Sequence, residues 1–136
     1  MNNELSSYRL TIRERHVDSY GHVNNATYLE LYEEARWEVI TPRGFGFKDI
    51  QVKRQGPVIL EIQIQFRREI NLREDITITT QLLDYNGKVG RMKQQMIKAD
   101  GTVASEVVLT FGLFDLESRK LIEPTREWKM ALGLHE

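Results

Sequence analysis

The stretch NATYLELYEEARWEVITP, residues 25–42, decides the fold. Its apolar positions recur at helical spacing and form one continuous face: Tyr28, Tyr32, Ala35 and Val39, flanked by Leu29, Leu31 and Ile40. The pattern predicts an amphipathic helix from Asn25 to about Thr41, roughly 25 Å long. Asn24 or Asn25 is expected to cap its first turn, and Pro42 is expected to push Thr41 out of the helical region.

Strand patterns surround this helix. Residues Tyr8 to Glu14 alternate polar and apolar types before it. After Pro57 the period changes to two, which predicts a half-buried antiparallel strand with one apolar face made of Leu60, Ile62, Ile64 and Phe66.

Two hairpins follow, because Asn86-Gly87 and Asp100-Gly101 are dipeptides favoured in tight turns, the first of type I′. They join strands expected at about 75–85, 88–99 and 102–116, so these strands form a meander. After Glu123-Pro124-Thr125 a short amphipathic helix is expected, containing Trp128, Met130, Ala131 and Leu132.

The predicted class is α+β, with an antiparallel five-stranded sheet wrapped around one long central helix in a single domain, residues 1–136. One helix cannot cover both faces of such a sheet. We therefore expect a face or an edge of the sheet to be satisfied by a second copy of the chain.

Composition excludes several functions. The 19 basic and 20 acidic residues give a net charge of -1 and are spread along the chain, which argues against nucleic-acid or membrane partners. The absence of cysteine excludes disulfides, thiolate metal sites and cysteine nucleophiles. With no signal-peptide pattern and no apolar run of membrane-spanning length, a cytoplasmic location is expected.

Chemistry is expected in residues 18–25, DSYGHVNN, between the first strand and the start of the long helix. First-turn N–H groups of a helix lack intrahelical partners and can stabilise a developing oxyanion, and a carboxylate just upstream can face the same volume. Thioester hydrolysis needs these two elements and little more, because the departing thiol has a pKa near 8.5.

The motif Asp18-x-x-Gly21-His22-Val23-Asn24-Asn25-x-x-Tyr28, followed by Glu33 and Ala35-Arg36, resembles the signature of acyl-CoA thioesterases related to 4-hydroxybenzoyl-CoA thioesterase, and of the plant acyl-ACP thioesterases. The resemblance covers roughly residues 8–132, including Gly56-Pro57, Phe66-Arg67, Asp75 and Ile122-Glu123-Pro124. It implies a hot-dog fold and hydrolysis of acyl-CoA or acyl-ACP thioesters in lipid metabolism, without cofactor or metal. It also implies a homodimer, or a dimer of dimers, with the acyl chain between helix and sheet.

The resemblance also implies residue roles. Asp18 is expected to be the nucleophile or general base, and the backbone N–H of Asn25 to polarise the thioester carbonyl. His22 matches a histidine in the catalytic set of the acyl-ACP branch. The expected substrate contacts are Tyr20, which stands where that branch has asparagine, Tyr28, Gly56 on a strand lining the acyl pocket, and Lys88 and Arg91 near the coenzyme A phosphates.

Simpler roles compete with these. Asp18 is also typical of a turn residue bound to its own backbone, and His22 of a loop histidine holding Asn24 or Asp18. His16, Asp18 and His22 do not have a known zinc spacing, so a solvated His16 is expected. Glu33 is either a buried support or a solvated helical residue, and Lys88 and Arg91 are otherwise solubilising charges.

Two other functions stay open on the sequence. One is a non-catalytic acyl-CoA-binding or regulatory module of the same fold. The other is a dehydratase or hydratase acting on acyl thioesters.

Overall fold

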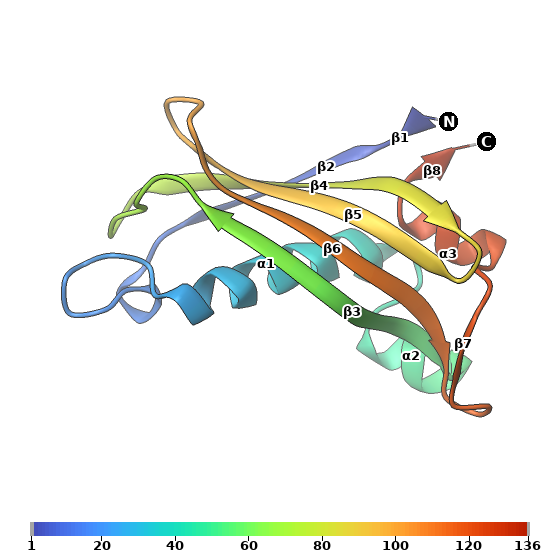
Figure 1. Cartoon of the computed structure of the whole chain (residues 1–136). Helices are drawn as coiled ribbons and strands as arrows, with labels where there is room; N and C mark the ends of the chain where they lie inside the picture. Colours follow the sequence, from blue (N-terminus) through green and yellow to red (C-terminus); the bar gives the residue numbers. More distant parts are fainter. Residues whose placement is uncertain (1, 136) are drawn as a thin grey trace.

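The computed structural model describes residues 2–135, and its main elements follow the expected order of strand, long helix and meander (Figure 1). The helices are α1 (Asn25–Ile40), α2 (Phe47–Lys53) and α3 (Arg126–Ala131), with 3-10 turns at Glu14–His16 and Thr41–Arg43. The strands are β1 (Asn2–Asn3), β2 (Leu5–Thr11), β3 (Gln55–Phe66), β4 (Asp75–Asn86), β5 (Val89–Lys98), β6 (Val103–Asp115), β7 (Lys120–Ile122) and β8 (Leu134–His135). No helix within residues 2–135 combines the length and apolar character that a membrane span requires.

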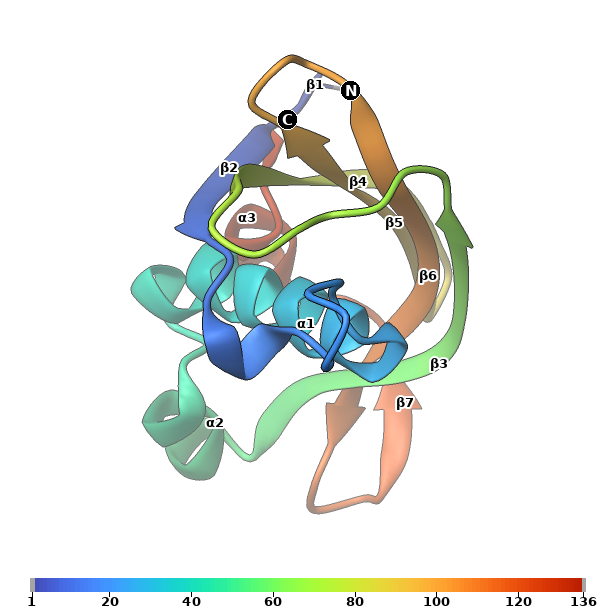
Figure 2. The same cartoon turned by 90° about the vertical axis from the view of Figure 1, so that its left-hand side faces the viewer.

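The large sheet has the strand order β2-β4-β5-β6-β3, all antiparallel, and the short β7 pairs with β6. The expected five strands are therefore confirmed, with β7 as an addition that the sequence did not predict. Figure 2 shows the sheet curving around α1, while α2 and α3 lie beside the end of α1. The strands β1 and β8 form a separate small pair.

Helix α1 supplies the centre of the core. Its buried residues are Tyr28, Leu31, Tyr32, Ala35 and Ile40. They pack with inward residues of the meander such as Ile78, Met96 and Leu109, all of which are at most 1 % exposed. The helix lies closer to β2 and β4 than to β3. This offset leaves room between α1 and β3.

Two boundaries differ from expectation. The first strand is Leu5–Thr11, earlier than predicted, because β4 offers partners as far as Gln81 and the chain turns into a 3-10 helix at Glu14. The prediction that Pro42 would push Thr41 out of the helical region is wrong, since Thr41 has φ -58 and ψ -50. Pro42 lies in the first turn of the following 3-10 helix, Thr41–Arg43, where its missing N–H donor is not needed, and that helix ends at Gly44 with φ 95.

Two details of the strands also differ. The first hairpin turns on Gly87-Lys88, because Asn86 pairs with Val89. Gly87 has positive φ and Lys88 does not, which is the pattern of a type II′ turn rather than the predicted type I′. The pairing of β3 with β6 shifts between Ile59 and Glu61. Leu60 lies at this irregularity and is 48 % exposed, so it does not share a buried face with Ile62 as predicted.

Gly90 marks a tight contact at one end of this core. A Cβ at this position would lie 2.7 Å from Cζ of Phe111 and 2.9 Å from the ring of Tyr85. These rings pack edge to face with centroids 5.7 Å apart, and Phe111 also packs on Trp128 of α3.

We predict that Gly90→Ala lowers the free energy of unfolding by about 1–3 kcal/mol, because the added methyl group overpacks these rings. Denaturant unfolding monitored by circular dichroism measures the change. Gln95→Ala, on the outer face of the same strand, is the control and should change stability by no more than about 0.5 kcal/mol. Equal stability of Gly90→Ala and wild type would contradict the packing described here.

Candidate active site

Residues 17–23 form a small closed loop before α1. Val17 and Val23 pair as an isolated antiparallel bridge, and the N–H of Asp18 donates to the carbonyl of His22 at 2.9 Å. The chain reverses at Gly21, whose φ of +83 favours glycine and whose N–H donates to the carbonyl of Asp18 at 3.0 Å. The expected loop is therefore an ordered turn.

Hydrogen bonds tie this loop to the rest of the fold on two sides. The N–H of Val23 donates to the carbonyl of Ile70 at 3.2 Å, and the N–H of Leu72 donates to the carbonyl of Gly21 at 3.1 Å. The N–H of Asn24 donates to the carbonyl of His16 at 3.3 Å. The loop is thus held between the 3-10 turn Glu14–His16, the start of α1 and the β3–β4 connection.

The carboxylate of Asp18 makes the local turn contacts expected of a loop aspartate, and it does so with one of its two oxygens. Its Oδ1 accepts from the backbone N–H groups of Tyr20 at 2.9 Å and His22 at 3.3 Å, which is a local turn contact. Its Oδ2 has no hydrogen-bond donor within residues 2–135. Asp18 is one of the residues that line a cavity of about 380 Å³.

The start of α1 contributes a free donor to the same place. Asn24, one of the two predicted candidates, is the N-cap, and its side chain accepts from the N–H of Ala26 at 3.1 Å. Its carbonyl accepts from Thr27 and Tyr28. The N–H of Asn25 has no acceptor within the described part of the chain, and Asn25 lines the cavity beside Asp18.

We call this space the carboxylate cavity. Its lining residues come from the loop, from α1 and from the β3–β4 connection: Asp18, His22, Val23, Asn25, Tyr28, Phe66, Arg67, Arg68, Glu69 and Ile70. Four expected site residues, Asp18, His22, Asn25 and Tyr28, are brought together here. Burial raises the pKa of Tyr28, so its hydroxyl is protonated at neutral pH.

The sequence analysis did not predict the polar residues that the β3–β4 connection contributes to the carboxylate cavity. Arg67 binds Glu106 at 2.7 Å, while Arg68 donates to the carbonyl of Arg67 and has no carboxylate contact among residues 2–135. The Nε2 of His22 lies 3.4 Å from Oε2 of Glu69. The available signal was the Phe66-Arg67 resemblance, which did not extend to the next two residues.

The prediction of a solvated His16 is wrong. This residue is 8 % exposed, its Nδ1 accepts from the N–H of Arg13 at 2.9 Å, and burial lowers its pKa. The 3-10 turn folds the histidine inward. No group of three or more metal-ligating side chains gathers in the described residues.

The other expected substrate contacts lie outside the carboxylate cavity. Tyr20 is 84 % exposed at the tip of the loop, and Gly56 lies against Ile50 of α2. Lys88 is in the β4–β5 hairpin, and Arg91 is held by Asp84 through Nη2 at 2.5 Å. In one chain this hairpin is at the opposite end of the sheet from the Asp18 loop (Figure 1). Their roles stay predictions.

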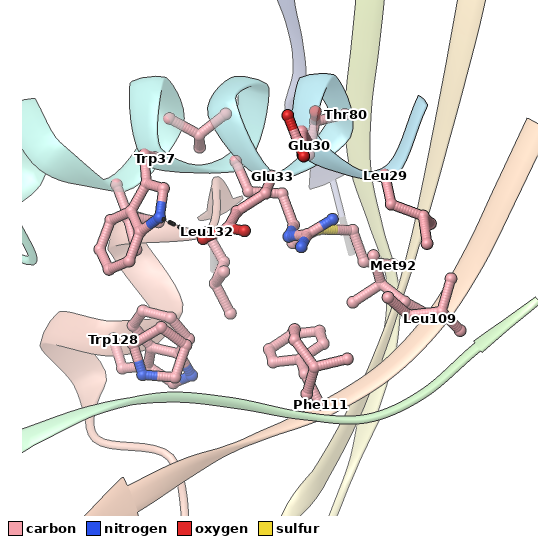
Figure 3. A pocket seen from close by; sticks show the side chains of 16 residues that line it. Leu29, Glu30, Glu33, Trp37, Thr80, Met92, Leu109, Phe111, Trp128 and Leu132 are labelled. Atoms are coloured by element: carbon pink, nitrogen blue, oxygen red, sulfur yellow. Dashed lines mark hydrogen bonds between the residues drawn. The ribbon is translucent and has the colours of Figure 1, made fainter. Parts of the chain in front are cut away.

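A second, apolar cavity of about 360 Å³ opens between α1 and the sheet. Figure 3 shows Leu29, Glu33 and Trp37 of α1 on one side of it, and Met92, Leu109, Phe111 and Trp128 on the other. Ile59 and Ile62 of β3 also line it, together with Arg36 and Thr80. We call it the apolar cavity.

The two cavities follow one another along the space between α1 and β3. Tyr28 and Phe66 line the carboxylate cavity, while Leu29 and Ile62, further along the same two elements, line the apolar cavity. The rings of Tyr28 and Phe66 meet edge to face with centroids 5.0 Å apart.

The chain is similar to known thioesterases in sequence and in fold. The chain is 36% identical over 115 residues to the long-chain acyl-CoA thioesterase FadM of Escherichia coli K12, covering 84% of this chain and 86% of the relative. It is similar to the crystal structure of YbaW, a probable thioesterase from Escherichia coli, with a TM-score of 0.81 at 34% identity, over 93% of this chain and 96% of that one. A Staphylococcus aureus protein, SAV2348 in complex with CoA, shares the fold, with a TM-score of 0.87 at 19% identity over 96% and 83% of the two chains.

These structures confirm the hot-dog fold. The family model described as the thioesterase-like superfamily matches residues 12–132. That range takes in α1, α3 and every strand of the large sheet except β2. The match therefore includes the loop, the long helix and all of the large sheet but its first strand, and the chain belongs to the thioesterase-like superfamily.

Proposed function

We propose that this chain hydrolyses acyl-CoA thioesters to a free carboxylic acid and coenzyme A. One observation carries the proposal: Asp18, whose Oδ2 accepts no hydrogen bond from the described residues, and Asn25, whose N–H has no acceptor among them, line the same cavity. A carboxylate and a helix-start donor are the two groups that thioester hydrolysis needs. The relatives named as acyl-CoA thioesterases support the choice of substrate.

In the proposed reaction the thioester carbonyl oxygen accepts from the N–H of Asn25. Negative charge then grows on this oxygen as Asp18 either takes a proton from an attacking water or attacks the carbonyl carbon itself. In the second case the acyl group is left on Asp18 as a mixed anhydride, and a water then cleaves this bond to release the carboxylic acid and restore the carboxylate. The two turn contacts to Oδ1 hold the carboxylate in place without using Oδ2. Coenzyme A leaves as a thiolate, which needs no strong general acid because its pKa is near 8.5.

The acyl chain is proposed to lie in the apolar cavity, reached past Tyr28 and Phe66. This cavity is lined mainly by apolar side chains and adjoins the carboxylate cavity along α1. The name of the FadM relative, a long-chain acyl-CoA thioesterase, favours coenzyme A over carrier protein and a long chain over a short one.

A homodimer formed through β3 is part of the proposal. This strand of 12 residues lies at one end of the sheet order, so one of its edges is unpaired within the described chain. It also exposes Ile59, Leu60 and Phe66, at 38%, 48% and 50%. Pairing with a second β3 would extend the sheet and cover these side chains, placing the cavities at the interface.

Single-domain organisation of residues 1–136 and a cytoplasmic location stay predictions from the sequence.

We predict that Asp18→Asn lowers kcat for acyl-CoA hydrolysis by about 10²- to 10⁴-fold and leaves the fold intact, since asparagine keeps the turn acceptor but neither attacks nor accepts a proton. Thiol release from a series of acyl-CoAs measures it. Asp100→Asn is the matched control, because Asp100 accepts the same kind of local contact, from the N–H of Thr102 at 2.9 Å, outside both cavities.

Near-normal kcat in Asp18→Asn would exclude the mechanism. If the wild type binds acyl-CoA but releases no thiol at any chain length, the chain is a binding module instead. Release of a hydrated or dehydrated acyl thioester would indicate the hydratase or dehydratase reaction.

We also predict that Leu60→Lys converts the dimer to a monomer, because a charge on an exposed strand edge opposes pairing with another strand. Light scattering should give twice the 16.0 kDa chain mass for the wild type and a single chain mass for the variant. Val52→Lys, a replacement of an equally apolar side chain that is 83 % exposed on α2, should leave the dimer intact. A monomeric wild type would rule out this assembly.

A further inference from the structure

Arg36 is a cation placed among apolar groups. It lies on α1, is partly buried, and lines the apolar cavity with Leu109, Phe111 and Trp128. Burial lowers its pKa. Its one hydrogen bond to the described residues runs from Nη1 to Oε1 of Gln94 at 2.9 Å, and no carboxylate of these residues is in ion-pair contact with it. The remaining guanidinium N–H groups have no protein acceptor there.

Gln94 fixes the direction of this arginine. The glutamine side chain is fully buried, and its Nε2 donates to the carbonyl of Tyr32 and to Oγ1 of Thr80, each at 3.0 Å. Because both amide N–H groups are used, the amide oxygen must face Arg36. The guanidinium is therefore oriented by a neutral buried amide, while the Glu33 carboxylate, which makes no direct ion pair with it, attracts it and raises its pKa against the effect of burial.

The charged side chains that line the apolar cavity determine which ligand group can bind beside Arg36. Glu30 and Glu33 also line it, so two carboxylates accompany the single guanidinium. Glu33 accepts from Nε1 of Trp37 at 3.1 Å (Figure 3), so it too is oriented by a neutral group. An anionic ligand would meet two like charges here. A neutral oxygen could accept from Arg36, and a hydroxyl could also donate to Glu33.

A plain hydrocarbon chain in this cavity would be unfavourable where it meets the guanidinium of Arg36. It would displace water from the guanidinium and offer no acceptor in return, which is costly for a charged group. A chain with an oxygen at that point restores the hydrogen bond. Sites built to bind a polar group discriminate strongly against analogues that lack it.

We propose that Arg36, oriented by Gln94, forms a subsite for a neutral hydroxyl or keto oxygen carried on the acyl chain, so that oxygenated acyl groups are preferred over plain ones. The inference rests on the proposed function in one respect, namely that the acyl chain occupies the apolar cavity. It assigns to this cavity a specificity beyond chain length.

The test compares acyl-CoAs of one chain length, either plain or carrying a hydroxyl or keto group at successive positions. For the wild type, kcat/KM for at least one oxygenated isomer should exceed that for the plain chain by about tenfold or more. In Arg36→Met this ratio should fall to near one. Arg126→Met removes an exposed arginine outside both cavities and should retain the ratio.

Binding of thioether analogues, which cannot be hydrolysed, separates this inference from the proposed function. A tighter Kd for an oxygenated analogue that is lost in Arg36→Met supports the subsite even if no thioester is cleaved. Equal kcat/KM and equal Kd for plain and all oxygenated chains in the wild type overturn the subsite, whether or not Arg36→Met folds. Thiol release from plain chains would then still uphold the hydrolase.

Discussion

The hydrogen bonds that hold residues 16–24 against the start of α1 are the constraint on which the site depends. Asn24 donates to His16 and caps the helix, Val23 donates to Ile70, and the loop between them closes on Asp18. These contacts decide where the carboxylate lies relative to the free N–H of Asn25. Because most of them use backbone groups, the arrangement tolerates side-chain variation at exposed positions such as Tyr20, whereas Gly21 must supply its positive φ.

The offset of α1 within the curved sheet determines where the apolar cavity lies. Since the helix packs towards β2 and β4, a space is left next to β3, and the irregularity at Leu60 turns Ile59 and Ile62 towards that space. Phe111 and Trp128, which line this cavity, also attach α3 to the sheet. The hydrophobic core thus borders an apolar cavity, and Arg36, bound to Gln94, is the one basic side chain among the described residues that line it.

Local sequence signals predicted α1, a cap at Asn24 or Asn25, and the meander of β4 to β6, because helical period, capping residues and turn dipeptides act over a few neighbouring residues. The wall made by Arg68 and Glu69 could not be predicted in this way. It reaches Asp18 through backbone pairing between distant segments, which leaves no pattern in either one. The burial of His16 and the bulge at Leu60 likewise depend on tertiary packing, and Thr41 stayed helical because a 3-10 turn accommodates Pro42.

The central claim is that Asp18 and the N–H of Asn25 face one carbonyl group. A crystal structure of the wild-type protein with an acyl-CoA analogue in which a methylene replaces the thioester sulfur tests this most directly, since the analogue keeps the carbonyl but cannot be cleaved. We predict that the carbonyl oxygen lies about 3 Å from the amide nitrogen of Asn25, with Oδ2 of Asp18, or a water bound to it, facing the carbonyl carbon. A carbonyl bound away from the start of α1, in either subunit of the assembly, would contradict the account.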